Sequence, residues 1–312
     1  MKLGIVGSGA VGSACLLALV VRGSAREIVI LDRDRKRARA VAMDLGYGAP
    51  LASVVDIGDG DYPDLAGAEL VIISAGINEK SGGAIDRSDP AGRLKLLETN
   101  VGVYRDVLPR LSRVAPDALV LVLTDPPDPL ADFVRAAGFR RVLSSGTYID
   151  SLRFRHHVAR RLNVAPASVE ADLLGEHGTS EVFMWSSPRV GTAPVLELIE
   201  RSGGERQELR RGVEQDVRYA NIAIIEGNQA SQFGIGIVAA RIVEAVLRDE
   251  RVVIPVGSYN PTYGATLSMP SVVGRAGVLR ILDPSMSDEE RHALERSAER
   301  LRAVVAGFRD VI

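Results

Sequence analysis

A glycine-rich turn near the start of the chain constrains the fold more than any other feature. In GIVGSGAVG, Gly7, Gly9 and Gly12 keep a G-x-G-x-x-G spacing between a strand-like run, KLGIV, and a helix-like run, AVGSACLLALVVRG. This spacing is typical of a tight bend at Gly7, close backbone approach to a pyrophosphate at Gly9 and helix–strand packing at Gly12. It predicts a parallel α/β sheet whose first crossover binds a dinucleotide.

An acid after the second predicted strand supports this interpretation. Asp32 follows EIVIL and stands twenty residues after Gly12. A carboxylate there can accept both adenosine ribose hydroxyls and repels the extra phosphate of NADP, so NAD is the expected cofactor. The alternative is that the glycines form only a structural turn and Asp32 caps the next helix, and the adjacent Arg33 leaves the strictness of the NAD preference open.

The order of the predicted elements indicates the fold class. Short apolar runs alternate with helical patterns in the first half, and LVIIS, ALVLVL and RVLSS continue as strands that are buried on both faces. We expect an α/β fold, a Rossmann-type doubly wound parallel sheet followed by an α+β substrate domain. The expected domains are residues 1–145 for NAD binding and 146–312 for catalysis. Ser287 is a plausible N-cap of the final amphipathic helix.

Composition excludes several classes of function. The net charge is −2 and the arginines are scattered, which gives no electrostatic case for nucleic acid or an anionic membrane. The longest apolar runs fall short of the roughly 20 residues that span a bilayer. Cys15 is the only cysteine, which rules out an intrachain disulfide and a Cys-based metal cage. No secretion signal is evident, and a cytoplasmic location is expected.

A candidate catalytic group lies in the second half. In GTYIDSLRFRHH, Asp150 and Arg153 are three residues apart and share one helix face, and LLGEHGTSEV places His177 in a glycine-flanked turn. A carboxylate that fixes an imidazole beside an arginine that clamps a substrate carboxylate would support acid–base chemistry. By residue type alone, a surface ion pair and an incidental histidine are the favoured interpretation.

The chain resembles the L-lactate/malate dehydrogenase family from end to end. The resemblance is carried by GIVGSGAVG with Asp32, IISAG, RSDPAGRLKLLETN, LTDPPDPL, GTYIDSLRFR, GEHGTSEVF and ASQFGIG. It implies an NAD-dependent enzyme that interconverts an L-2-hydroxy acid and its 2-oxo acid. His177 would exchange the proton, Asp150 would be its partner and Arg153 would clamp the substrate C1 carboxylate. Arg93 would polarise the reacting carbonyl from a mobile loop.

The same resemblance suggests a substrate. Arg87, six residues before Arg93, falls where malate dehydrogenases similar to this chain carry arginine and lactate dehydrogenases carry glutamine. A cation there favours a second carboxylate, so malate and oxaloacetate are the expected pair, with L-lactate or a bulkier 2-hydroxy acid as the alternative. The loop INEKSGGAID is longer than the family pattern, however. If it moves Arg87 away, Asn78, Glu79 or Lys80 faces the substrate instead.

Asp125 is a second departure, because the family has asparagine at this position of LTDPPDPL. An ionised carboxylate only accepts hydrogen bonds, disfavours a nearby anion and favours protonated His177. Alternatively, Asp125 bonds backbone or ribose and hardly affects the chemistry. Ser231 matches a small hydroxyl residue beside the nicotinamide and substrate, with a bond to its own helix backbone as the alternative.

The resemblance completes the expected site. The predicted cofactor-binding residues are Gly7, Gly9, Ala10, Val11, Gly12, Asp32, Ser74, Ala75, Gly76, Asn100, Thr124 and Asp125. No metal site is expected, and the family implies a homodimer or homotetramer. There are two rival functions. One is an NAD-dependent glycosidase, which needs a Cys and His metal site and is disfavoured by the single cysteine, and the other is an NAD-binding protein with weakened catalysis.

Overall fold

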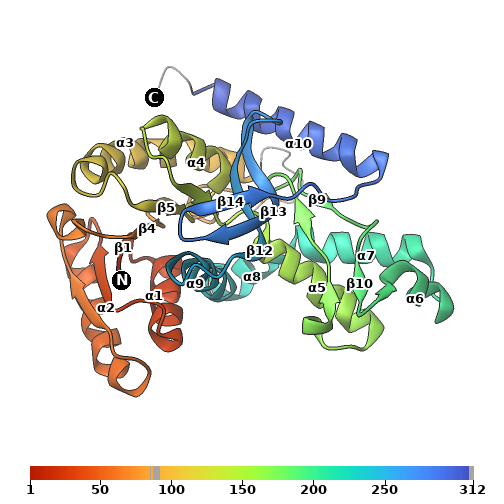
Figure 1. The fold of residues 1–312 in the computed structure, drawn as a ribbon, viewed down its shortest axis with the longest axis horizontal. Coiled ribbons are helices and arrows are strands. Elements are labelled where there is room, and N and C mark those ends of the chain that lie inside the picture. The colour runs from red at the N-terminus through yellow and green to blue at the C-terminus, as the bar shows by residue number, and fades with distance from the viewer. Residues whose placement is uncertain (85, 87–91, 309–312) are drawn as a thin grey trace.

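The computed structural model describes residues 1–84, 86 and 92–308, without the side chains at positions 92 and 93. Within this part of the chain, the main sheet has the order β14-β13-β12-β6-β5-β4-β1-β2-β3 (Figure 1). Its strands are β1 (Lys2–Val6), β2 (Glu27–Leu31), β3 (Asp56–Asp59), β4 (Leu70–Ile73), β5 (Leu119–Val122), β6 (Val142–Ser144), β12 (Val252–Asn260), β13 (Ala265–Gly274) and β14 (Gly277–Ile281).

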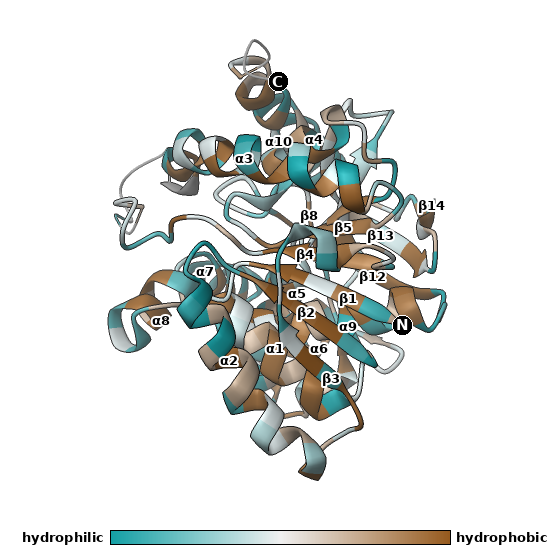
Figure 2. Cartoon of the chain, turned by 90° about the vertical axis from the view of Figure 1, so that its left-hand side faces the viewer, coloured by the Kyte–Doolittle hydropathy of each residue, from teal (hydrophilic) through white to brown (hydrophobic). Residues whose placement is uncertain are grey.

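The first six strands form the predicted doubly wound parallel sheet. They pair in parallel, with β1 between β2 and β4. Alternate residues enter two different cores: Leu3 and Ile5 of β1 face one cluster, and Val6 faces the other. Because side chains alternate across a strand, helices must cover both faces. Figure 2 shows this arrangement, with apolar strands between two helical layers.

The two helical layers come from distant parts of the sequence. α1 (Ala10–Arg22) and α2 (Arg35–Gly48) lie on one side with α9 (Phe233–Leu247), which packs against α1. α3 (Leu97–Val114), α4 (Pro127–Ala136) and α10 (Asp288–Ala306) lie on the other (Figure 2). The fold of the second half is therefore needed to complete the core of the first.

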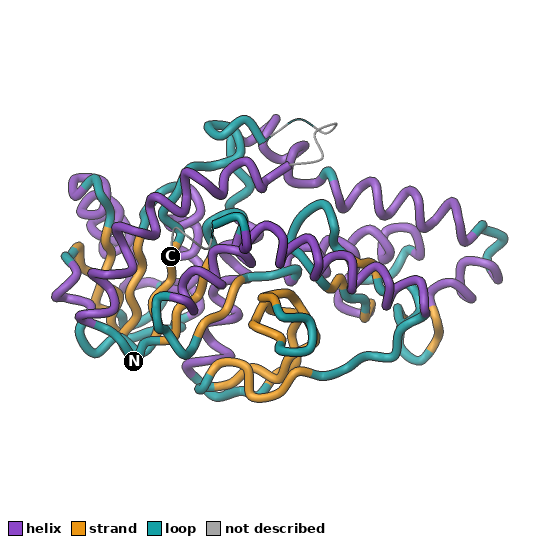
Figure 3. The backbone as a smooth tube through the Cα atoms, turned by 90° about the horizontal axis from the view of Figure 1, so that it is seen from above, coloured by secondary structure: helices purple, strands orange, loops and turns teal. Residues whose placement is uncertain are grey.

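The sheet continues across the predicted domain boundary at residue 145. β12 runs antiparallel to β6 through the pair Gly257 and Ser144, and β13 and β14 extend the sheet further. The predicted boundary, which separates residues 1–145 from residues 146–312, therefore divides one continuous sheet. The strands near the N-terminus lie side by side with helices around them in Figure 3.

The remaining elements form a separate lobe around α5 (Tyr148–Leu162). It contains α6 (Val195–Arg201), α7 (Arg206–Arg218), α8 (Ala220–Asn228) and the short strands β7 (Val169–Glu170), β8 (Leu173–Leu174), β9 (Val182–Phe183), β10 (Arg189–Val190) and β11 (Ala193–Pro194). Its core includes Phe154 and Trp185, whose rings pack edge to face with centroids 4.7 Å apart. Figure 1 shows this lobe beside the main sheet.

Local signals explain several element boundaries. Asp34 caps α2 by accepting hydrogen bonds from the Lys36 and Arg37 backbone N–H groups, and Ser287 caps α10 in a capping box with Glu290, as predicted for Ser287. The largely helical segment from Glu205 to Arg248 contains α7, α8 and α9 as separate helices. Strand β3 was not predicted, because its sequence DIGD has no apolar run.

A membrane-spanning helix must be both long and apolar. In the described part of the chain, no single helix meets both requirements. α8 and α9 meet them only as a pair, and a bend of 118° separates these two helices.

Candidate active site

Glycine suits each of the three motif positions for a different physical reason. Gly7 has a φ of 103°, and a Cβ there would lie 2.6 Å from the Ala75 backbone nitrogen. A Cβ at Gly12 would lie 2.0 Å from the Gly7 carbonyl oxygen, so only glycine allows the helix to pack on the turn. Among the described residues, no atom would lie within 4 Å of a Cβ at Gly9.

The open space at Gly9 fits the phosphates of a dinucleotide. Gly9 is the N-cap residue of α1, and no side chain bonds to the free backbone N–H groups there. Gly9, Ala10 and Val11 line a cavity of about 280 Å³. Free N–H groups and the positive end of a helix together favour a bound anion, so this end of the cavity suits the pyrophosphate.

Asp32 is fixed next to the glycine turn. Its Oδ2 accepts hydrogen bonds from the Ser8 backbone N–H at 2.8 Å and the Ser8 hydroxyl at 2.9 Å, and its Oδ1 accepts the Asp34 N–H. Burial acts to raise the pKa of Asp32, but these bonds and the nearby charge of Arg37 outweigh it and hold the pKa below its ordinary value. The carboxylate is therefore ionised near neutral pH, as the predicted contact with the adenosine ribose of NAD requires.

The loops after β4 and β5 are tied together behind the cavity. Asn100 is fully buried; its Oδ1 accepts the Ile77 N–H and its Nδ2 donates to the Asp125 carbonyl oxygen at 2.6 Å. Thr124 donates to the Ala75 carbonyl oxygen, and a Cβ at Gly76 would lie 2.5 Å from the Thr124 side chain. The structure therefore gives Asn100 a role in holding the two loops that carry Ser74, Gly76 and Asp125.

Two of the predicted catalytic residues, His177 and Asp150, come together with Arg153 between α5 and the turn from β8 to β9. His177 Nδ1 lies 2.5 Å from Asp150 Oδ2, and Arg153 donates to Asp150 Oδ1 at 2.8 Å. A second Arg153 nitrogen reaches the Ser231 hydroxyl at 3.4 Å. Asp150, with its side chain 3% exposed, thus holds both the imidazole and the guanidinium. Ser231 precedes α9, and its contact is with Arg153.

Asp128 is a fourth residue of this group that the sequence analysis missed. It is fully buried at the start of α4, where its Oδ2 accepts the His177 backbone N–H at 2.7 Å and its Oδ1 accepts the Ser144 hydroxyl at 2.5 Å. Burial raises the pKa of Asp128 to about 7, although hydrogen bonds from His177 and Ser144 oppose the rise. The signal that could have identified Asp128 in the sequence is an acidic residue among apolar residues at the start of a helix.

One cavity joins the cofactor and catalytic ends. The predicted residues that line it are Gly9, Ala10, Val11, Ser74, Gly76, Thr124, Asp125, Arg153, His177 and Ser231. Gly7, Gly12, Asp32, Ala75, Asn100 and Asp150 support this lining from behind or beside it. Arg87 and the side chain of Arg93 lie outside the described residues.

The loop after β4 also reaches the cavity. Asn78 and Glu79 line it, and the Lys80 ammonium donates a hydrogen bond to the Gln229 side chain. Gln229 stands two residues before Ser231, which contacts Arg153. Glu79 therefore belongs to a segment that meets the substrate end of the site.

Family models match almost the whole chain. The lactate/malate dehydrogenase NAD-binding domain matches residues 1–141, and the alpha/beta C-terminal domain of the same family matches residues 147–310.

Individual relatives agree with the family models. The L-lactate dehydrogenase of Deinococcus radiodurans is 42% identical over 304 residues and covers 97% of both chains. That of Thermus aquaticus is 42% identical over 317 residues and covers 99% of both. The crystal structure of the minor L-lactate dehydrogenase from Enterococcus mundtii, in a ligands-bound form, superposes with a TM-score of 0.90 at 32% identity and covers 99% of this chain and 98% of that one.

The geometry and the comparisons lead to the same identity. The dinucleotide turn, which an ionised Asp32 adjoins, and the residues Arg153 and His177, which Asp150 holds, line one cavity. This protein belongs to the lactate/malate dehydrogenase family and is an NAD-dependent L-2-hydroxy acid dehydrogenase.

Proposed function

We propose that the enzyme interconverts L-lactate and pyruvate. The observation that carries this proposal is the set of charged side chains around the cavity. Among its described lining residues, Arg153 provides a cation at the catalytic end, whereas Arg37 lies 3.8 Å from Asp32 at the cofactor end. One guanidinium clamps one carboxylate, which suits a monocarboxylic substrate.

The chemistry of the residues follows from their contacts. NAD bound along the glycine turn would supply the hydride chemistry. His177, held by Asp150 through Nδ1, presents its Nε2 to the substrate, donates a proton to the oxygen when the 2-oxo acid is reduced and accepts it back in the reverse direction. Asp150 fixes the orientation of the imidazole ring. Arg153 orients the substrate carboxylate beside His177.

A second carboxylate would meet an unfavourable charge. Glu79 and Asp125 both line the cavity, and each repels an anionic substrate tail. The relatives described above are named L-lactate dehydrogenases, which also supports the monocarboxylate. The malate preference that the sequence suggested depends on Arg87, which is outside the described residues, and it has no support from the comparisons.

The test compares pyruvate with oxaloacetate by following NADH oxidation with purified protein. We expect a higher kcat/KM for pyruvate. Glu79→Gln removes the repelling charge and should raise the oxaloacetate/pyruvate ratio of kcat/KM by about tenfold, the scale of one close charge interaction. The matched variant Glu98→Gln changes an exposed acid on α3 and should leave the ratio unchanged.

Arg87→Gln tests the competing prediction in the same assay. If oxaloacetate is preferred and Arg87→Gln lowers the oxaloacetate/pyruvate ratio while Glu79→Gln does not change it, Arg87 selects a dicarboxylate and the lactate proposal is wrong. If neither 2-oxo acid is turned over, the rival function as a weakened NAD-binding protein replaces it.

The association of copies of this chain and its location in the cell are further expectations. We infer that copies of the chain pair through α1 and α9, where Leu17, Val21, Phe233 and Ile237 are each at least half exposed. Sedimentation velocity would measure this association, and a monomer at assay concentration would contradict it.

The single cysteine, Cys15, is buried and its pKa is raised by burial to about 12, so it is an unreactive packed thiol. A cytoplasmic location stays a prediction.

A further inference from the structure

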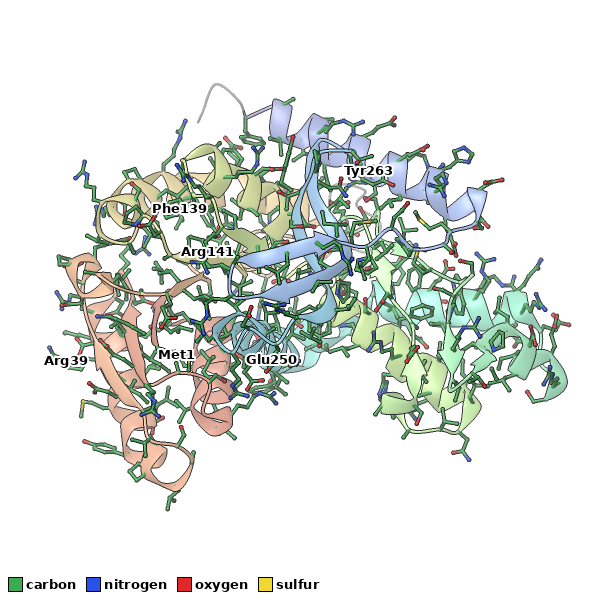
Figure 4. The ribbon with its side chains drawn as sticks, in the orientation of Figure 1. Met1, Arg39, Phe139, Arg141, Glu250 and Tyr263 are labelled. Atoms are coloured by element: carbon green, nitrogen blue, oxygen red, sulfur yellow. The ribbon has the colours of Figure 1, made fainter. Side chains whose placement is uncertain are left out.

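A second cavity lies away from the catalytic group, between α4 and the strands β6, β12, β13 and β14. Its volume is about 330 Å³, and it shares no lining residue with the cavity at His177. Four arginines line it: Arg135, Arg140, Arg141 and Arg280. Arg141 lies beside the strands β12–β14 in Figure 4.

The charges of these arginines are only partly balanced. Arg135 packs its guanidinium over the Tyr259 ring at 3.9 Å and places Nε 3.3 Å from Asp132 Oδ1. Arg140 and Arg280 are exposed and have no ion pair within the described residues. None of the described residues that line the cavity is acidic. A concave surface with clustered arginines attracts anions.

Two buried polar groups in the same cavity lack partners. In the described part of the chain, the Ser258 hydroxyl has no hydrogen bond although the residue is only 6% exposed. Arg141 donates through its terminal nitrogens to the Asp117 and Arg275 carbonyl oxygens, but its buried Nε has no acceptor. Buried polar groups normally have partners, so these two indicate a ligand that accepts hydrogen bonds.

Not every polar group in the cavity lacks a partner within the described part of the chain. Thr266 also lines the cavity, but its hydroxyl donates to Asp132 Oδ1 at 2.9 Å. Burial lowers the pKa of Arg141 and the charge of Arg275 lowers it further, while Glu69 and Asp117 oppose the shift. A bound anion would stabilise the charged form of Arg141.

We propose that this cavity binds a small phosphate-bearing anion. Phosphate oxygens accept hydrogen bonds only, and their geometry matches the planar guanidinium fork. Arg141 Nε and the Ser258 hydroxyl would donate from the buried side, while Arg140 and Arg280 would approach from the exposed side. Nothing in the lactate–pyruvate reaction requires this site.

Calorimetric titration of pyrophosphate tests the proposal. The protein is first saturated with NADH, so that the pyrophosphate site at Gly9 is filled, and ionic strength is kept constant. We expect one saturable site. Ser258→Ala should weaken it by about tenfold, and Arg140→Gln combined with Arg280→Gln should weaken it further, because hydrogen bonds to charged groups are strong. Ser258→Ala removes no bond present in the unliganded protein, so it should fold normally.

Two controls separate this site from other anion sites. Arg160→Gln changes an exposed arginine at the end of α5 and should leave binding unchanged. Arg153→Gln removes the substrate clamp and should also leave it unchanged. Absence of saturable binding, loss of binding in Arg153→Gln or an equal loss in Arg160→Gln would overturn the proposal. Equal affinity for malonate would overturn the phosphate assignment.

Discussion

The cofactor end and the catalytic end of the main cavity are built in different ways. At the cofactor end, the backbone from Gly7 to Gly12 forms the binding surface, and Asp32 comes from the next strand of the sheet. At the catalytic end, side chains from α4, α5, the turn after β8 and the segment before α9 meet through hydrogen bonds. A backbone site tolerates changes of side chain except at its glycines, whereas a side-chain site depends on every member.

Replacing His177 by Gln should have the largest effect. The variant cannot exchange the proton, so kcat should fall by about a hundredfold to ten-thousandfold. NADH affinity, measured by fluorescence titration, should stay unchanged because the cofactor end is independent. A parallel loss of NADH binding would show that the two ends are coupled.

Replacing Asp128 should lower activity at the catalytic end, although we do not expect this residue to contact the substrate. Asp128→Ala leaves the buried His177 N–H without its acceptor, which should cost about 1–3 kcal/mol of unfolding free energy. The displaced imidazole should lower kcat by up to about a hundredfold. Asp128→Asn keeps an acceptor for that N–H and should retain most of the activity. Equal kcat in both variants would remove Asp128 as a positioning residue.

Gly9 and Gly12 allow a matched test of the cofactor end. Gly12→Ala places a Cβ against the Gly7 carbonyl oxygen and should destabilise the protein by about 1–3 kcal/mol. Gly9→Ala meets no neighbour and should change stability by less than about 0.5 kcal/mol. It should still weaken NADH binding by about tenfold, because the added methyl group keeps the pyrophosphate from the backbone. Unchanged NADH affinity in Gly9→Ala would place the pyrophosphate elsewhere.

The last prediction concerns the pH dependence of stability. The folded pKa of Asp128 is about 7 and lies above its ordinary value of 3.8. Its contribution to stability is therefore full below about pH 3.8 and lost as pH rises through about 7. From about pH 5 to about pH 8, the wild type should lose unfolding free energy relative to Asp128→Asn in urea denaturation. A constant difference would mean that Asp128 does not titrate in this range.

The candidate site was predictable where its signals are local or its motifs specific. Gly7, Gly9 and Gly12 stand within one turn, and the motifs around Asp150, Arg153 and His177 pointed to the residues that the structure brings together. Asp128 was missed because its partners, Ser144 and the His177 backbone, are distant in sequence. Which residues of the long loop face the substrate was left open, and the structure brings Glu79 into the lining.

The sequence by itself determined the parallel α/β core, because alternating apolar strands and helices with a glycine turn between β1 and α1 allow few other arrangements. It also determined the dinucleotide end of the site, since Asp32 follows the strand that pairs with β1. Tertiary structure alone decided that β12–β14 extend the same sheet and that four arginines line one cavity with Ser258. Such contacts join residues far apart in the chain, and no local pattern encodes which of them will meet.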